Sequence, residues 1–302
     1  MSWRVVVISQ TSKLDYKMDY LVVRTNDQVK RIHLSEISVL MIETTSVSLT
    51  AYLLCELANR KIDVIFCDHK KLPHGQYIPY FGSHDASKSI RIQMGWTAEL
   101  KGTVWKSIVA KKIEAQAAVL KQTDHIQESN KLLCYLPEIE INDVTNREGH
   151  AAKVYFNALF GMDFTRVEKE NTINAELNYG YSVLLSVVAR EVVTNGYLTQ
   201  IGIHHDNVFN YLNLASDLME PFRPLVDMIV VRMDHGVFNT EQKRKLVSFL
   251  NRRIEIDGRE QYIVNALNIY VKSVFDSMEV NDPLIIKYPK YELSLYESSG
   301  IL

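Results

Sequence analysis

The sequence has few cysteines and no long apolar run. Its three cysteines, Cys55, Cys67 and Cys134, are scattered over 302 residues and form no C-x-x-C pair. This spacing excludes a zinc-binding cysteine framework and a disulfide scaffold, and it predicts reduced cysteines in a cytoplasmic protein. No apolar stretch reaches the roughly 20 residues that a membrane-spanning helix needs. The first residues also lack the apolar core and cleavage site of a signal peptide, so we expect no membrane association.

An excess of charge of one sign is missing as well. Lys and Arg number 34, and Asp and Glu number 36, which gives a formal net charge of −2. A strongly basic chain would indicate a nucleic-acid partner directly, whereas here any DNA contact must come from local basic patches. The hydrophobic fraction of 47% is ordinary for a folded protein, and the length suits two domains.

Residues 1–80 predict a small β-rich domain. Runs of β-branched residues occur at Trp3–Ser9 and Tyr20–Arg24, and Ile62–Cys67 repeats the pattern. Within this range, helical periodicity occurs at Ser48–Arg60. We therefore expect one helix on a small sheet, and the exposed faces of that sheet are candidates for a subunit interface.

A turn-rich segment separates this domain from the rest of the chain. Pro, Gly, His and Ser gather over Pro73–Ser89, which predicts an interdomain linker at residues 81–92. Residues 93–302 then read as helical throughout, and Ile90–Gln122 predicts one long helical stretch with a break near Gly102. The expected fold class is α+β, with a β-rich N-terminal domain carrying one helix and a larger, all-α C-terminal domain.

The stretch His204–Pro224 (HHDNVFNYLNLASDLMEPFRP) concentrates chemically active side chains. Asp217 and Glu220 are three residues apart, so a helix would place both carboxylates on one face. A histidine from the preceding loop, His204 or His205, would add an imidazole. Oxygen ligands with one imidazole suit Mg²⁺ or Mn²⁺. Taken alone, the stretch is more typical of a solvated surface, because charged residues mostly lie outside unless they are paired.

Glu148 is a third candidate ligand. It lies in Val144–Leu159, near the first turn of an expected amphipathic helix. One interpretation is that its carboxylate only complements the helix dipole, which is common for a first-turn glutamate. The alternative is a metal ligand that a separate helix brings to the stretch His204–Pro224.

Four short segments carry a family resemblance. NREGHAAKVYF, LNYGYSVLL, GIHH and DLMEPFRP follow one another along the chain. Together they resemble the CRISPR-associated integrase family, the first protein of the spacer-acquisition core, and nearly the whole chain takes part. The sequence is most similar to the branch from type II systems, which have a single RNA-guided effector nuclease. The resemblance implies a metal site of Glu148, His205 and Glu220, with Asp217 beside it and His204 as the alternative imidazole.

The resemblance also implies an activity and partners. It implies a metal-dependent DNA endonuclease and integrase, with its catalytic domain in residues 93–302, that uses Mg²⁺ or Mn²⁺. The enzyme would join the 3′-hydroxyl of a short spacer-precursor DNA to a CRISPR repeat. Implied partners are double-stranded DNA, a second copy in a homodimer, and the small second acquisition protein, with two dimers around one partner dimer. Other acquisition proteins and the effector nuclease are further candidates.

Two other functions stay open. One is a stand-alone metal-dependent nuclease that cleaves branched or duplex DNA, with water in place of the 3′-hydroxyl. The other is a non-catalytic scaffold that binds DNA and partner proteins. The predicted ligands Glu148, His205 and Glu220 argue against the scaffold.

Several basic side chains are candidates for phosphate contacts. For Arg223 we favour a structural pair with Asp217 or Glu220, because its planar guanidinium matches a carboxylate. Basic residues on the expected helix Asn239–Arg253 fit a solvated face equally well. The DNA-binding candidates are Arg147, Lys153, Arg166, Arg190, Arg223, Lys243 and Arg244.

Overall fold

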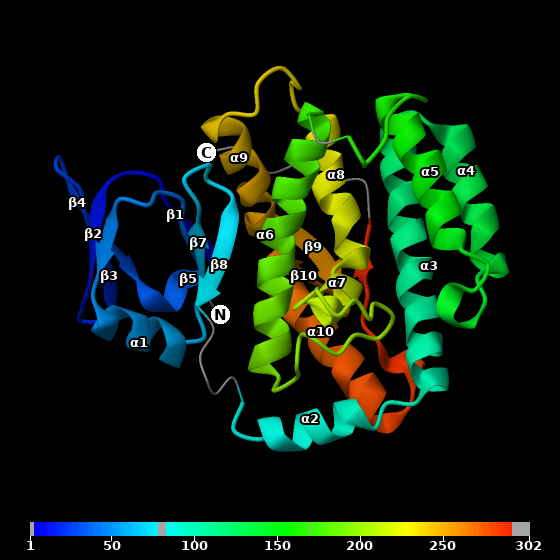
Figure 1. Ribbon diagram of the computed structural model, residues 1–302, viewed down its shortest axis with the longest axis horizontal. Helices are drawn as coiled ribbons and strands as arrows, with labels where there is room; N and C mark the ends of the chain where they lie inside the picture. Colours follow the sequence, from blue (N-terminus) through cyan, green and yellow to red (C-terminus); the bar gives the residue numbers. More distant parts are fainter. Residues whose placement is uncertain (1–2, 78–82, 169, 292–302) are drawn as a thin grey trace.

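The computed structural model describes residues 3–77, 83–168 and 170–291 (Figure 1). Two sheets and one helix form the N-terminal part, and a larger helical part follows. The predicted α+β class, with a β-rich N-terminal domain before a mainly helical one, is confirmed. Within the described ranges, every helix is too short or too polar to cross a membrane.

Two four-stranded sheets build the N-terminal part. The first has the order β1-β5-β7-β8, in which β1, β5 and β7 are parallel and β8 is antiparallel to β7. The second has the order β4-β3-β2-β6, in which β6 is parallel to β2 and the other neighbours are antiparallel. The elements of this part are β1 Arg4–Ile8, β2 Ser12–Lys17, β3 Tyr20–Arg24, β4 Val29–His33, β5 Ile37–Ile42, β6 Val47–Leu49, α1 Ala51–Asn59, β7 Asp63–Cys67 and β8 Pro73–Tyr77.

The first sheet is buried on both faces because it lies between two hydrophobic cores. All six residues of β5 are buried. Val39 and Met41 belong to the core of the helical part, whereas Leu40 and Ile42 belong to a second core under the other sheet and α1. This alternation follows from the two-residue period of a strand. The two parts therefore pack through a shared sheet, and Figure 1 shows α6 (Thr172–Thr194) alongside it.

The predicted linker at 81–92 is largely structured. The turn-rich residues Pro73–Tyr77 form β8, and residues 78–82 lie outside the described residues. Helix α2 (Ala86–Met94) then begins inside the expected linker.

The side chain of Gln93 explains why α2 is ordered against the helical part. Its amide nitrogen donates hydrogen bonds to the carbonyls of Leu198 at 2.8 Å and Ile201 at 2.9 Å. Its amide oxygen accepts a hydrogen bond from the Leu198 backbone N–H at 2.9 Å. A buried glutamine with three partners anchors the helix, so a polar sequence here is not a flexible connection.

Helix α3 (Ala98–Gln122) is continuous, so the expected break near Gly102 is wrong. A Cβ at Gly102 would lie 2.7 Å from Cγ2 of Ile141. The glycine therefore permits close packing against η3 (Ile141–Asp143) and does not end the helix. The other helices are α4 Ile126–Tyr135, α5 Arg147–Phe160, α7 Asn213–Leu218, α8 Arg223–Val231, α9 Thr240–Val247 and α10 Ile263–Val280. The other short 3-10 turns are η1 Leu34–Glu36, η2 Leu136–Glu138, η4 Glu220–Phe222, η5 Ser248–Asn251 and η6 Pro283–Ile285.

The helical part also contains a small sheet that the sequence analysis did not expect. Its order is β10-β9-β11, formed by Arg259–Tyr262, Arg253–Ile256 and Pro289–Lys290. Asp257 and Gly258 connect the first two strands with φ values of 53° and 70°. An Asp-Gly pair with positive φ is the preferred two-residue hairpin turn, and this signal was overlooked in a region that otherwise reads as helical.

A buried carboxylate connects the first sheet to α6. Asp63 on β7 accepts a hydrogen bond from the Gln76 side chain on β8 at 2.5 Å, and the same amide donates to the Ser186 carbonyl on α6 at 2.8 Å. Burial raises the pKa of Asp63 to about 6, although Arg190 and Gln76 oppose the shift. The interface between the two parts therefore includes a group that titrates in mildly acidic solution.

We predict that Asp63→Asn flattens the pH dependence of stability between about pH 4 and 6. In this interval native Asp63 holds a proton that the unfolded chain has lost, so the free energy of unfolding falls as pH rises and stays lower above pH 6. A shift of two pKa units corresponds to about 3 kcal/mol. Urea unfolding at several pH values measures the fall. Equal slopes for Asp63→Asn and wild type would contradict the prediction, and the exposed Asp27→Asn is the control.

Candidate active site

Three separate elements bring two carboxylates to one lysine. Lys112 lies in the middle of α3, Glu148 in the first turn of α5, and Glu220 at the start of η4. The Nζ atom of Lys112 lies 2.5 Å from Oε1 of Glu148 and 2.5 Å from Oε2 of Glu220. The side chain of Lys112 is 8% exposed, so the pair of carboxylates faces a cation that is almost removed from water. Two of the three predicted ligands are thus close together.

Glu220 is buried and charged because it has two cationic partners. Nη1 of Arg223 donates a hydrogen bond to its Oε1 at 2.7 Å, and Lys112 contacts Oε2. Burial alone would raise the pKa of Glu220, but Arg223 and Lys112 outweigh burial and lower that pKa below its ordinary value. The guanidinium of Arg223 lies 4.2 Å from the centre of the Tyr181 ring. The favoured structural pairing of Arg223 is confirmed.

Glu148 does more than complement a helix dipole. Asp143 already caps α5, since its two carboxylate oxygens accept hydrogen bonds from the backbone N–H groups of Arg147 at 2.8 Å and Glu148 at 2.9 Å. The carboxylate of Glu148 is therefore free to point across to Lys112. The side-chain hydrogen bonds that cap α5 therefore come from Asp143, and the carboxylate of Glu148 pairs with a lysine instead.

His205 is oriented by a completely buried carboxylate. Asp217 accepts hydrogen bonds from the backbone N–H groups of Ile203, His204 and His205 at 2.6, 2.9 and 3.1 Å. Its Oδ1 also lies 2.5 Å from Nδ1 of His205. Because a carboxylate only accepts, Nδ1 must carry the hydrogen, and Nε2 stays available as a ligand or proton acceptor. This hydrogen bond, opposed by burial, raises the pKa of His205.

The neighbouring His204 has a packing role. Its ring stacks on Trp105 with the ring centres 4.3 Å apart and an interplanar angle of 2°. Its Nδ1 lies 3.0 Å from Oδ1 of Asn142. His205, in contrast, lines a pocket together with Glu220 and Arg223. The structure therefore places His205, and not His204, beside the carboxylates.

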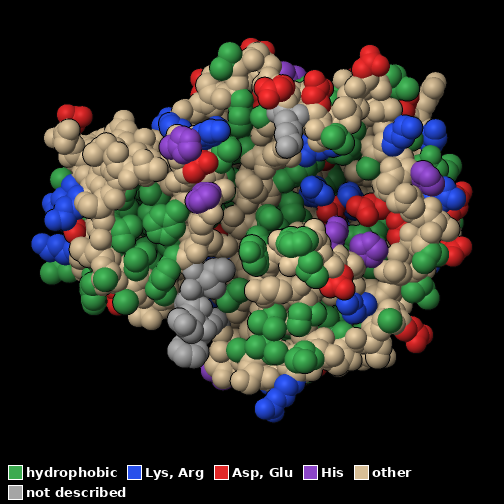
Figure 2. All heavy atoms as spheres, viewed as in Figure 1, with side chains coloured by type: hydrophobic (Ala, Val, Ile, Leu, Met, Phe, Trp, Pro, Cys, Tyr) green, Lys and Arg blue, Asp and Glu red, His purple; other side chains and the backbone are tan. Residues whose placement is uncertain are grey.

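The pocket beside Glu220 has a volume of about 360 Å³ and a polar lining. In addition to His205, Glu220 and Arg223, it includes the side chains of Asn178 and Ser216. Figure 2 shows acidic, basic and histidine side chains gathered in a hollow on this face, between α7 and α5. A polar hollow with charges of both signs suits a substrate with a charged backbone.

The donor atoms fit a hard divalent ion, with one qualification. Glu148 and Glu220 already contact the same cation, Nζ of Lys112. Carboxylate oxygens and an imidazole nitrogen are ligands that Mg²⁺ and Mn²⁺ accept. Among the described residues, however, no group of three His, Cys, Asp or Glu side chains is close enough together to hold a metal ion. Lys112 lies at the place between Glu148 and Glu220 where such an ion would contact both.

Most of the basic candidates for DNA contacts have partners within the protein. Arg223 has Glu220, and four others are held as follows: Arg147 by Glu138, Arg166 by Asn174 and Asn178, Arg190 by Glu191 and the Lys61 carbonyl, and Lys243 by the Lys70 carbonyl. Lys243 is buried, so the predicted basic face of its helix does not include it.

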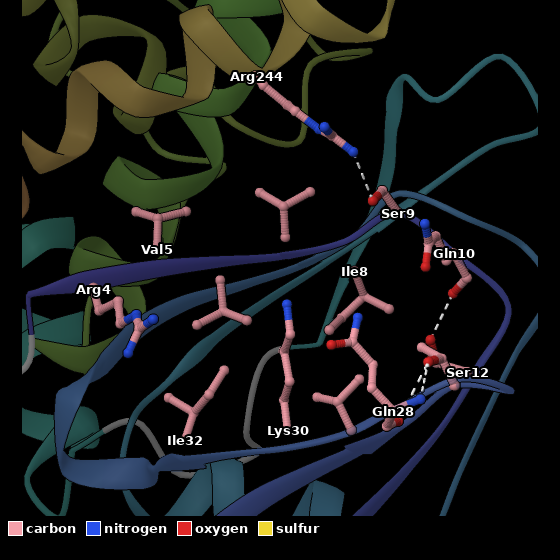
Figure 3. A pocket seen from close by; sticks show the side chains of 14 residues that line it. Arg4, Val5, Ile8, Ser9, Gln10, Ser12, Gln28, Lys30, Ile32 and Arg244 are labelled. Atoms are coloured by element: carbon pink, nitrogen blue, oxygen red, sulfur yellow. Dashed lines mark hydrogen bonds between the residues drawn. The ribbon is translucent and has the colours of Figure 1, made fainter. Parts of the chain in front are cut away.

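Two basic candidates are exposed. Lys153 lines a groove between α4 and α5. Arg244 reaches from α9 over an opening of about 400 Å³ between the two sheets and donates a hydrogen bond to the Ser9 hydroxyl at 2.9 Å (Figure 3). These two side chains are the candidates that solvent, and therefore a nucleic acid, can reach most easily.

Comparisons with known proteins decide the family. The sequence profile of the family described as CRISPR associated protein Cas1 matches residues 5–245. A CRISPR-associated endonuclease Cas1 from Neisseria meningitidis is 34% identical over 278 residues, which cover 90% of this chain and 91% of that protein. The chain belongs to the Cas1 family. The predicted family is thereby confirmed.

This Cas1-family chain is also similar in fold to solved structures. A casposase bound to its integration product has a TM-score of 0.74 at 18% identity, over 100% of this chain and 96% of that one. A chain of a Cas6-RT-Cas1–Cas2 complex has a TM-score of 0.70 at 18% identity and covers 96% of this chain. The match spans 36% of that longer chain. At these identities the likeness shows a shared fold.

Sequence reasoning missed three residues of this site. Lys112 was not singled out within the expected helical stretch Ile90–Gln122. Asp143 was not considered as a cap. Gly202 was used only as a landmark of the GIHH segment, whereas the structure shows that the loop has no space for a side chain there.

We predict that Gly202→Ala disturbs the His205 loop. A Cβ at this position would lie 2.2 Å from the backbone oxygen of His205 and 2.8 Å from Oδ2 of Asp217. Because the obstructing atoms are a backbone oxygen and a buried carboxylate, relief requires movement of the loop, and we expect a loss of about 1–3 kcal/mol in unfolding free energy. Denaturant unfolding measures this loss. In the control Gly236→Ala the nearest atom is 3.7 Å away, and equal stability of both variants would refute the explanation.

Proposed function

We propose that this Cas1-family protein is a metal-dependent DNA integrase of CRISPR adaptation. It inserts short duplex DNA at a CRISPR repeat by attack of a 3′-hydroxyl on a phosphodiester. The observation that carries the proposal is the convergence of Glu148 and Glu220 on one cation, with His205 in the polar pocket that Glu220 also lines. The name of the Neisseria relative and the casposase structure support an enzyme that breaks and joins DNA.

Glu148, Glu220 and Nε2 of His205 would hold the Mg²⁺ or Mn²⁺ ion. When bound, this ion supplies charge stabilisation at the phosphorus and a more acidic hydroxyl. Asp217 holds the imidazole of His205 in one orientation, with Nδ1 protonated and Nε2 directed away from Asp217. Arg223 neutralises one oxygen of Glu220 and keeps this carboxylate ionised, so that its other oxygen can face a cation. Asp217 thus acts as a positioning residue.

One of the solved structures supports a protein partner. The structure titled as a Cas6-RT-Cas1–Cas2 complex supports Cas2 as the small second acquisition protein. We propose a homodimer through the N-terminal sheets and two such dimers around one Cas2 dimer, with double-stranded DNA in contact with the exposed Lys153 and Arg244. The identity of 34% to the Neisseria protein supports the type II branch, in which the effector nuclease and further acquisition proteins would be additional partners.

A hydrolytic nuclease is the second candidate, because the Neisseria relative is named an endonuclease. The same residues would then direct water at the phosphodiester in place of a 3′-hydroxyl. Integration joins two strands, whereas hydrolysis only shortens them, so the products distinguish the two reactions.

We predict that strand transfer depends on Glu148. Purified protein, with and without Cas2, would be incubated with labelled short duplex DNA, a supercoiled plasmid bearing a repeat, and Mn²⁺ or Mg²⁺. Wild type should join label to plasmid, and Glu148→Ala should lose at least about 100-fold in rate, as expected when a group that stabilises the transition state is removed. The exposed Glu140→Ala is the matched control.

Shortened label without joining would replace the integrase with the nuclease. Equal joining by Glu148→Ala and wild type would refute the role of Glu148.

A further inference from the structure

Lys112 occupies the position where the proposed divalent ion would have to bind. We propose that its ammonium is a built-in counter-cation of the site, which holds Glu148 and Glu220 together without metal and which Mg²⁺ or Mn²⁺ must displace. This inference rests on the proposed metal-dependent function. It assigns to Lys112 the role of setting how tightly the metal binds.

The distances place the ion and the ammonium close together. Each carboxylate oxygen lies 2.5 Å from Nζ of Lys112, so the two oxygens are at most 5 Å apart. An ion at the usual metal–oxygen distance of about 2.1 Å from either oxygen would lie within about 4.6 Å of Nζ, because the two distances from the shared oxygen add up to this limit. Two positive charges this close together repel each other strongly in a buried site. We therefore expect the ammonium to leave when the ion enters.

The contacts of Glu220 show how the ammonium can leave. Arg223 donates a hydrogen bond to Oε1 of Glu220 at 2.7 Å and is fixed by the Tyr181 ring. Oε2, in contrast, is paired with Nζ of Lys112 at 2.5 Å. Lys112 also has a flexible side chain with a compact charge, unlike the rigid guanidinium of Arg223. Glu220 therefore has one permanent cationic partner and one exchangeable partner.

A purely structural ion pair makes the opposite prediction. If Lys112 only stabilised the fold, its removal would leave two like charges side by side, the carboxylates would move apart, and metal would bind equally well or more weakly. If Lys112 competes with the metal, its removal frees the position between the carboxylates, and metal binds more tightly. The sign of the change in metal affinity separates the two roles.

The test compares Lys112→Met with Lys111→Met in the full chain. Lys111 is the neighbouring residue on α3 and pairs with Glu114 at 2.7 Å, outside the site. Mn²⁺ binding would be measured by electron paramagnetic resonance of the free ion and by calorimetry. We expect Lys112→Met to lower the Kd for Mn²⁺ at least tenfold, and Lys111→Met to leave it unchanged. Lys112→Met should also have a lower Tm without metal, and Mn²⁺ should raise its Tm more than that of wild type.

An unchanged or higher Kd for Lys112→Met would overturn the inference. Lys112→Arg gives a second measurement if the Met variant does not fold without metal. A guanidinium can bind both carboxylates with directed hydrogen bonds, so we expect at least a tenfold higher Kd for Mn²⁺, and an unchanged Kd would overturn the inference.

Glu148→Gln in the same binding assay separates this inference from the proposed function. If Glu148→Gln binds Mn²⁺ as wild type does, the metal site itself is refuted, and the proposed function with it. If Glu148→Gln weakens binding while Lys112→Met has no effect, only the role of Lys112 is refuted.

Discussion

A carboxylate buried as deeply as Glu220 stays ionised only when cations contact it, and the centre of the molecule is built around this requirement. Arg223 lies at one of its oxygens and Lys112 at the other, and Glu148 shares Lys112. Removal of one member of such a buried group typically costs about 3–5 kcal/mol, because an unbalanced charge remains. The four side chains come from α3, α5, η4 and α8, so their charges also fix the relative positions of these elements.

Helix α6 connects this group of charged residues to the first N-terminal sheet. On one side, Tyr181 supports the guanidinium of Arg223. Further along the same helix, the Ser186 carbonyl accepts a hydrogen bond from Gln76 of the first sheet. Val39 and Met41 of β5 add apolar contacts, because both side chains belong to the hydrophobic core of the helical part. The sheet is thus packed on the helix that supports the site, which explains why both parts of the chain belong to one body despite their different secondary structure.

The sequence was sufficient to predict the main divisions of the fold and the chemically distinctive residues of the site. Glu148, His205 and Glu220 were recognisable through the family resemblance of the segments that carry them, because such side chains taken alone are more typical of a solvated surface. Lys112 was not recognised, because its role arises only when three elements distant in sequence meet. Gly102 was misread for a related reason, since a glycine that allows close packing looks the same in sequence as one that ends a helix.

Asp217 and Glu220 lie on either side of a helix end. Their separation of three residues predicts a shared face only if one regular helix contains both. Helix α7 ends at Leu218, and Pro221 lies within the 3-10 turn η4 that follows. The chain therefore changes its helical geometry between the two acids, and they serve different partners. Asp217 turns to the backbone of the His205 loop, and Glu220 turns to Lys112 and Arg223. One carboxylate orients the imidazole, and the other faces two cations.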